Sequence, residues 1–161
     1  FYKSKTEIKV PTLRSVLDLV INKKKYLNIE LKPNKNYEIL NVNKVLQEIK
    51  QTPYDKIYCS SFDLSSCISL KEIAPQLQCG FLNDDFNKIN INETIDICKQ
   101  YNFFSCGINL KIYSKSIVSK FVENNIQVTV YSDHNISEVE AQNLWRNNVT
   151  SIFVDNPIEY F

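Results

Sequence analysis

The chain has 161 residues, of which 43% are hydrophobic and 23% are charged. This composition predicts one packed domain, residues 1–161, and excludes a disordered chain. The 19 basic and 18 acidic residues leave a net charge of +1. Such a balance gives no long-range attraction to nucleic acid or to an anionic membrane surface.

No apolar run approaches the roughly 20 residues of a membrane helix, so we expect no membrane span. The sequence begins at Phe1 without an initiator Met, and we expect it to be cut from a longer polypeptide. Five cysteines without CxxC spacing indicate neither a disulfide framework nor a zinc site. We interpret them as buried free thiols in a reducing compartment, which predicts a cytoplasmic protein. No pattern specifies the oligomeric state.

Short β-rich runs alternate along the chain with longer amphipathic stretches. Thr12 and Ser114 are expected as helix N-caps, and Ser137 with Glu140 as a capping box. The apolar spacing predicts helices over 13–25, 37–49, 64–73, 92–100, 114–124 and 137–147. Alternation and β-branched residues predict strands over 26–32, 56–62, 77–82, 103–108, 127–131 and 151–155.

Six β/α repeats indicate an α/β fold with parallel strands and right-handed crossovers. Two architectures fit: an open doubly wound sheet, or most of an eight-stranded β/α barrel of the TIM type. A complete barrel has about 250 residues, so a barrel interpretation places roughly 60 to 90 further residues upstream.

In both architectures functional residues gather where strands end. Glu30 and Lys32 are two residues apart on one strand, so their side chains share a face. They are either a buried ion pair or an anion site, in which Glu30 holds a hard cation and Lys32 meets a phosphate oxygen.

Several segments together resemble the glycerophosphodiester phosphodiesterase family. Residues 11–19 are similar to its "PTL..VLDL" helix, and residues 27–33 to its "NIE(I/L)K" strand. Residues 60–62 match its "SSF" strand. Asn143–Trp145 and 151–157 resemble its closing "LW…DGI.TD.P". The resemblance thus covers most of the chain, and it implies a TIM-type barrel of which this chain supplies strands three to eight.

The resemblance also implies an activity, namely hydrolysis of glycerophosphodiesters to an alcohol and glycerol 3-phosphate with a divalent metal, Mg or Ca. Glu30 matches the metal-binding glutamate, and Lys32 matches the lysine near the substrate phosphate. Phe62 belongs to a pocket-forming strand. Tyr131 stands where the family usually has a Trp beside the glycerol. We therefore predict Glu30 as a metal ligand and Lys32, Phe62 and Tyr131 as substrate-binding residues, with a small phosphodiester as the partner.

The family's "HRG" and "E.D" motifs do not occur in this sequence, so we predict no catalytic residue within it. The single histidine, His134, is expected in an exposed loop, or else beside the substrate. The alternative function is a catalytically inactive barrel that acts as a binding or structural module. The scarcity of glycine and the Trp-to-Tyr exchange favour that alternative, whereas the intact Glu30 and Lys32 favour the enzyme.

Three further features have simpler interpretations. Asp84 and Asp85 are expected to cap a helix or to lie in solvent rather than to bind metal. Asp155 is expected to form a turn before Pro157. Gly107, inside an apolar strand, is expected to allow a close backbone approach.

Overall fold

The fold is known from a computed structural model that describes residues 9–160. Six helices alternate with six strands. The helices are α1 Leu13–Asn22, α2 Glu38–Ile49, α3 Leu64–Ile73, α4 Ile91–Gln100, α5 Lys115–Glu123 and α6 Glu138–Arg146. The strands are β1 Leu27–Glu30, β2 Ile57–Ser61, β3 Gln78–Asn83, β4 Ser105–Asn109, β5 Gln127–Tyr131 and β6 Ser151–Ile152. Three short 3-10 helices are η1 Tyr54–Lys56, η2 Leu110–Ile112 and η3 Pro157–Tyr160.

The helices begin where polar side chains cap their free N–H groups. Thr12 and Ser114 accept hydrogen bonds from the backbone N–H groups three residues further on. Ser137 and Glu140 form the reciprocal capping box. These three predictions from the sequence are confirmed, because a cap depends on neighbours in the chain and not on tertiary packing.

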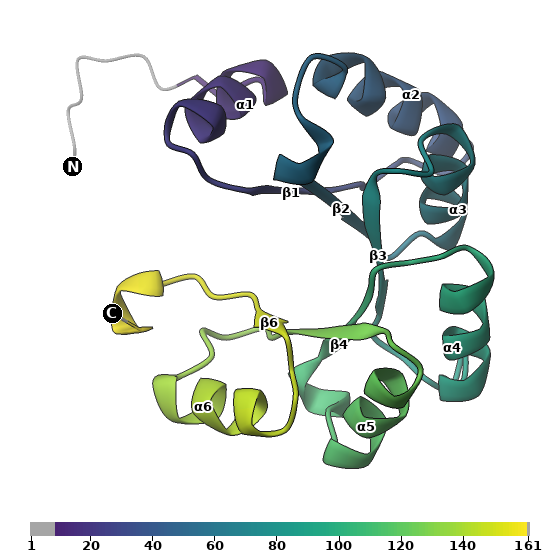
Figure 1. The fold of residues 1–161 in the computed structure, drawn as a ribbon, viewed down its shortest axis with the longest axis vertical. Helices are drawn as coiled ribbons and strands as arrows, with labels where there is room; N and C mark the ends of the chain where they lie inside the picture. The colour runs from purple at the N-terminus through teal and green to yellow at the C-terminus, as the bar shows by residue number, and fades with distance from the viewer. Residues whose placement is uncertain (1–8, 161) are drawn as a thin grey trace.

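All six strands are parallel and lie in chain order, β1 to β6. A doubly wound sheet reverses its strand order at a switch point, and no reversal occurs here. Figure 1 shows the consequence, a curled sheet with the helices in an arc around its outer side. The fold is therefore a six-stranded α/β half-barrel, and the doubly wound alternative is wrong.

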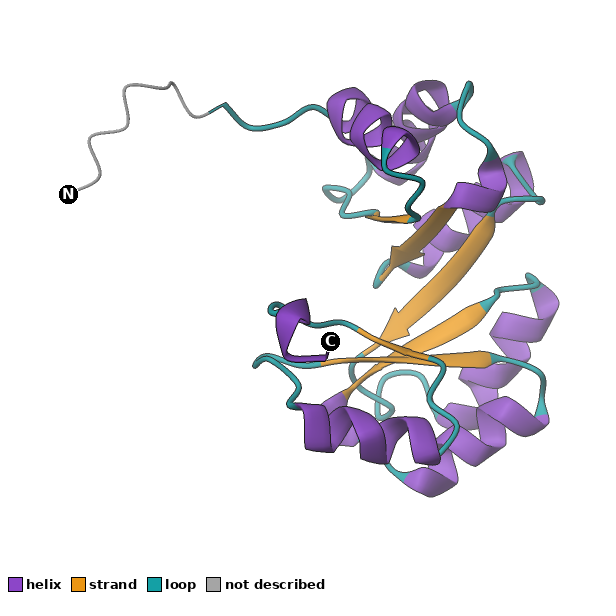
Figure 2. Ribbon diagram, turned by 60° about the vertical axis from the view of Figure 1, so that its left-hand side comes forward, coloured by secondary structure: helices purple, strands orange, loops and turns teal. Residues whose placement is uncertain are grey.

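The last strand is shorter than predicted. β6 covers only Ser151 and Ile152 rather than 151–155. Beyond it, the N–H groups of Asp155 and Asn156 donate to the Asn135 side-chain oxygen, at 2.9 and 3.1 Å. These bonds hold the chain where it leaves the sheet and leads to η3 (Figure 2). The bonding side chain is that of Asn135, and a turn formed by the Asp155 side chain stays a prediction.

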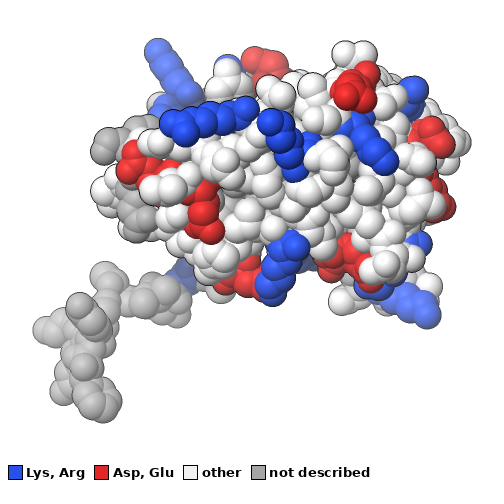
Figure 3. Space-filling view, turned by 90° about the horizontal axis from the view of Figure 1, so that it is seen from below, with Lys and Arg blue, Asp and Glu red and all other residues white. Residues whose placement is uncertain are grey.

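Charged side chains of both signs are interspersed over the face shown in Figure 3, as the near-zero net charge leads one to expect. Within residues 9–160, no helix is both long and apolar enough to cross a membrane.

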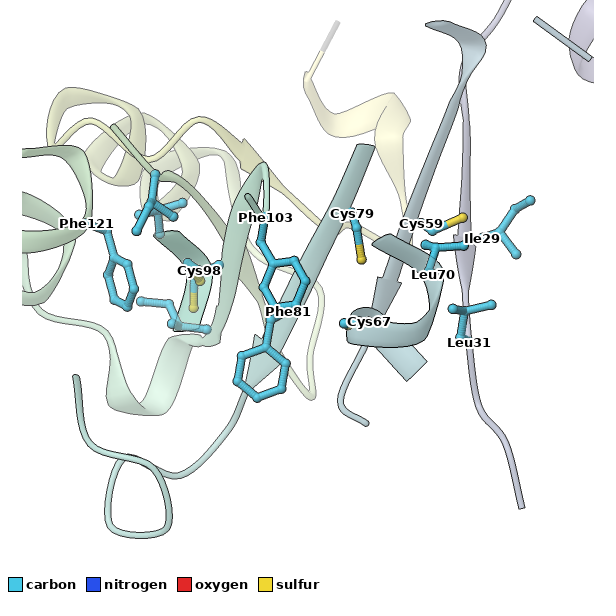
Figure 4. Close-up of a cluster of buried hydrophobic side chains, with 14 of the residues drawn as sticks. Ile29, Leu31, Cys59, Cys67, Leu70, Cys79, Phe81, Cys98, Phe103 and Phe121 are labelled. Carbon is cyan, nitrogen blue, oxygen red and sulfur yellow. The ribbon is translucent and has the colours of Figure 1, made fainter. Parts of the chain in front are cut away.

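The hydrophobic core lies between the convex side of the sheet and the helices, and it includes all five cysteines (Figure 4). They are buried and free, as predicted. Burial raises the pKa of the Cys59 thiol to about 12. Such a thiol stays protonated and acts as a small apolar side chain.

Large side chains cover glycines on the concave side of the sheet. A Cβ atom on Gly80 would lie 1.7 Å from the Tyr58 hydroxyl oxygen, and one on Gly107 would lie 2.3 Å from Leu82 Cδ2. The close approach expected at Gly107 is therefore real, but a side chain and not a backbone makes it. Both glycines leave space for a neighbour on the next strand.

The concave side carries uncharged polar groups, which bond across neighbouring strands. Ser60 Oγ donates to Asn28 Oδ1 at 3.1 Å, and Thr129 and Ser151 share a hydrogen bond of 2.9 Å. Residues of all six strands border one cavity of about 320 Å³, near the amino-terminal ends of the strands. Both ends of the sheet therefore face one concave floor.

Candidate active site at the carboxyl ends of the strands

The predicted site residues lie at the carboxyl ends of β1, β2 and β5. Ile29 and Leu31 are buried in the core under the helices. Because side chains alternate along a strand, Glu30 points to the concave side. Ser61 fixes this end of β1: its hydroxyl donates to the Leu31 carbonyl at 2.7 Å and accepts from the Asp63 N–H at 3.0 Å.

Glu30 and Lys32 form an ion pair of 3.2 Å. The two side chains thus meet as the sequence indicated. The pair is not buried, however, since 31% of the Glu30 side chain and 74% of the Lys32 side chain are exposed. An exposed pair contributes at most about 1 kcal/mol to folding. Either charge can therefore exchange its partner for a ligand at small cost.

Phe62 and Tyr131 form an aromatic wall at the same rim. Their rings meet edge to face, with centroids 5.4 Å apart and an interplanar angle of 86°. Burial raises the pKa of the Tyr131 phenol, and the negative charges of Asp84, Asp133 and Glu30 raise it further. The phenol therefore stays protonated at neutral pH.

A further group at the rim was not predicted as part of the site. Asn109, at the end of β4, donates from Nδ2 to Asp133 Oδ1 at 3.5 Å and accepts from the Lys111 N–H at 2.9 Å. Lys111 forms an ion pair with Asp133. The hydrogen bond and charge of Lys111 lower the pKa of Asp133. This group joins the ends of β4 and β5 next to Tyr131.

The histidine lies in the exposed loop after β5, as expected. His134 Nδ1 is 3.0 Å from the Ser132 hydroxyl, and its Nε2 is 3.7 Å from Glu140. About 61% of the side chain is exposed. These contacts place His134 at the beginning of α6, where it is a surface group.

Of the two acidic residues after β3, Asp84 and Asp85, the second stabilises its own loop. Asp85 Oδ1 accepts from the N–H and from the side-chain amide of Asn87, each at 2.9 Å. Asn83, which is buried, donates to the Ile89 carbonyl and to Thr94. This role of Asn83 was not predicted. Together these bonds hold the loop that carries Asp84.

The described side chains do not form a complete site for a divalent metal. Among residues 9–160, no three or more His, Cys, Asp or Glu side chains form a group that could hold a metal ion. A hard cation such as Mg or Ca takes about six oxygen ligands. Glu30 provides one carboxylate, so the described residues alone do not complete a metal centre.

The fold and the rim define a β/α-barrel type of protein with its candidate site where the strands end. The sequence model of the "glycerophosphoryl diester phosphodiesterase family" matches residues 1–159. The chain belongs to this family. A search of curated protein sequences returned no match.

Solved structures of similar fold are described as phosphodiesterases. A phosphodiesterase from Oleispira antarctica, solved with its product sn-glycerol-3-phosphate, matches with a TM-score of 0.81 at 20% identity over 93% of this chain and 59% of its own. A putative glycerophosphodiester phosphodiesterase from Galdieria sulphuraria matches with a TM-score of 0.79 at 16% identity, over 97% and 66%. A Thermotoga maritima glycerophosphodiester phosphodiesterase matches with a TM-score of 0.68 at 21% identity, over 90% and 60%. This chain therefore spans less than two thirds of the length of these proteins.

Proposed function

We propose that this chain is part of a metal-dependent enzyme that hydrolyses glycerophosphodiesters to an alcohol and glycerol 3-phosphate. The observation that supports this most is the exposed Glu30–Lys32 pair at the concave rim, in a chain of the glycerophosphoryl diester phosphodiesterase family. The product bound to the Oleispira antarctica relative agrees with it.

The proposal includes an architecture. Residues 1–161 form one domain and supply strands three to eight of an eight-stranded barrel. β1 and β6 are the two edges of the sheet, and two further parallel strands would pair with them and close the ring. The cavity that all six strands border would then become part of the interior of the barrel.

Each predicted site residue has a role in this proposal. Lys32 releases Glu30 and donates to a phosphate oxygen, as a charge-assisted hydrogen bond. Glu30 would be one ligand of a divalent metal, Mg or Ca, and the other ligands would come from outside the described residues. Phe62 and Tyr131 exclude water and hold the glycerol part of the substrate against a flat surface. The groups that transfer protons also lie outside this chain.

Hydrolysis of a glycerophosphodiester by the full-length protein, with added Mg or Ca, tests this function. We expect Glu30→Ala and Lys32→Ala each to lower kcat/KM by about 100-fold or more, because each removes a charge that faces the phosphoryl group. Glu123→Ala and Lys120→Ala, both on α5 and away from the rim, are the matched controls. Absence of hydrolysis, or full activity in both rim variants, would contradict the enzymatic function.

The alternative is an inactive barrel that serves as a binding or structural module. Two observations favour it: the described residues contain no complete metal-binding group, and His134 contacts Ser132 and Glu140 at the surface. This alternative predicts that glycerol 3-phosphate binds to the full-length protein while no diester is hydrolysed.

A further inference from the structure

A second cavity lies beside the rim, between the loop after β1 and the first half of α2. Its volume is about 250 Å³. The residues that line it are Lys32, Pro33, Asn34, Tyr37, Leu40, Asn41 and Lys44. Lys32 borders both this cavity and the Glu30 carboxylate, so the cavity adjoins the proposed active site.

The charge of this cavity is positive. Two of its lining side chains are lysines, and no lining residue is acidic. Lys32 has its ion pair with Glu30. Lys44, by contrast, forms no ion pair with a carboxylate within the described residues. An anionic group in this cavity would meet two ammonium groups, and charge-assisted hydrogen bonds are about twice as strong as neutral ones.

We propose that this cavity is an anion subsite for a phosphate group on the alcohol part of the substrate. The inference rests on the proposed function. Lys44 holds the second phosphate, and the Lys32 ammonium, which has three N–H donors, lies between the two phosphates and donates to both. Glu30 stays at the scissile phosphodiester.

Two diesters test the subsite in the full-length protein: glycerophosphoinositol, which has no second phosphate, and its 4-phosphate. We expect kcat/KM to favour the 4-phosphate, and we expect Lys44→Ala to lower the ratio of the two values by about 3- to 10-fold. The control is Lys50→Ala, because Lys50 is the C-cap residue of α2 and lies outside the cavity. An unchanged ratio in Lys44→Ala, or an equal fall in Lys50→Ala, would overturn the subsite.

A binding measurement separates the subsite from the activity. Titration of the same protein with inorganic phosphate is followed by backbone amide NMR shifts. We expect the shifts to lie within residues 32–44. The phosphate concentration at half-maximal shift should be at least about threefold higher in Lys44→Ala than in Lys50→Ala. Shifts confined to other residues would overturn the subsite. If neither diester is hydrolysed but these shifts occur, the proposed activity fails and the anion subsite stands.

Discussion

Tyr58 and Gly80 illustrate how tightly single residues fit on the concave side. The Tyr58 hydroxyl crosses over Gly80 to bond Ser105 Oγ at 2.7 Å. A methyl group at position 80 would lie 1.7 Å from that hydroxyl and 2.6 Å from Ser105 Oγ. Glycine is therefore required here for space, although its backbone conformation is ordinary.

The first prediction concerns this contact. Gly80→Ala should lower the free energy of unfolding by about 1–3 kcal/mol, the usual cost of overpacking. Urea denaturation measures it. In a Tyr58→Ala background the same substitution should cost much less, because the hydroxyl that it strikes is gone. An unchanged urea midpoint in Gly80→Ala alone would contradict the packing described.

The second prediction concerns alkaline pH. Burial raises the pKa of Tyr58 above its ordinary value near 10, although the Ser105 hydrogen bond opposes the shift. Above about pH 10 the folded state therefore binds this proton more tightly than the unfolded state, so stability falls as pH rises. Unfolding measured from pH 9 to 11 should show a slope that Tyr58→Phe makes shallower by up to about 1.4 kcal/mol per pH unit. An identical slope in the variant would disagree.

Sequence reasoning located Glu30 and Lys32 because strand alternation alone puts them on one face. It could not predict the contact between Asn109 and Asp133, because these residues are 24 positions apart. Such a contact depends on which strands are neighbours. The exposure of the Glu30–Lys32 pair was equally unpredictable, since it depends on what covers the concave side.

After three of the helices, asparagine takes the left-handed backbone conformation that glycine usually takes at helix ends. The chain has only 2 glycines. Asn102, Asn125 and Asn148 follow α4, α5 and α6 and have positive φ angles of 52°, 60° and 65°. Asparagine tolerates this left-handed conformation better than other side chains. Few glycines in loops therefore reflect this substitution, and they are no argument for an inactive barrel.

The third prediction follows from these helix ends. Asn125→Ala should lower the free energy of unfolding by about 1 kcal/mol, because an L-residue with a Cβ is strained in the left-handed region. Asn125→Gly should stay within a few tenths of a kcal/mol of the wild type or exceed it. Chemical denaturation of both variants measures the difference. Equal stability of the two would argue against the backbone conformation at this position.

Helices were predictable to within a few residues because their caps and apolar spacing are local. Strand limits were less so. The fourth strand was expected over 103–108 but covers Ser105–Asn109, and the sixth ends early where Asn135 binds the chain after it. Strand limits depend on hydrogen bonds to other strands, which a single sequence does not specify.

At the scale of the whole molecule, the repeat pattern predicted the parallel α/β class but allowed two architectures. The sequential strand order decides between them. It also explains why the site lies on one rim, since in-order parallel strands place all their carboxyl ends together. Whether two further strands close the ring follows from the proposed function and stays a prediction.

Glu30 and Lys32 are central to the proposed function, in which both face the substrate phosphate at the mouth of a closed barrel. A crystal structure of the full-length protein with glycerol 3-phosphate tests this directly. We predict eight parallel strands in a ring, with Lys32 Nζ within about 3 Å of a phosphate oxygen, a normal charge-assisted hydrogen bond, and Glu30 on the same side of the phosphate. Glycerol 3-phosphate bound elsewhere, or a sheet left open between β1 and β6, would contradict it.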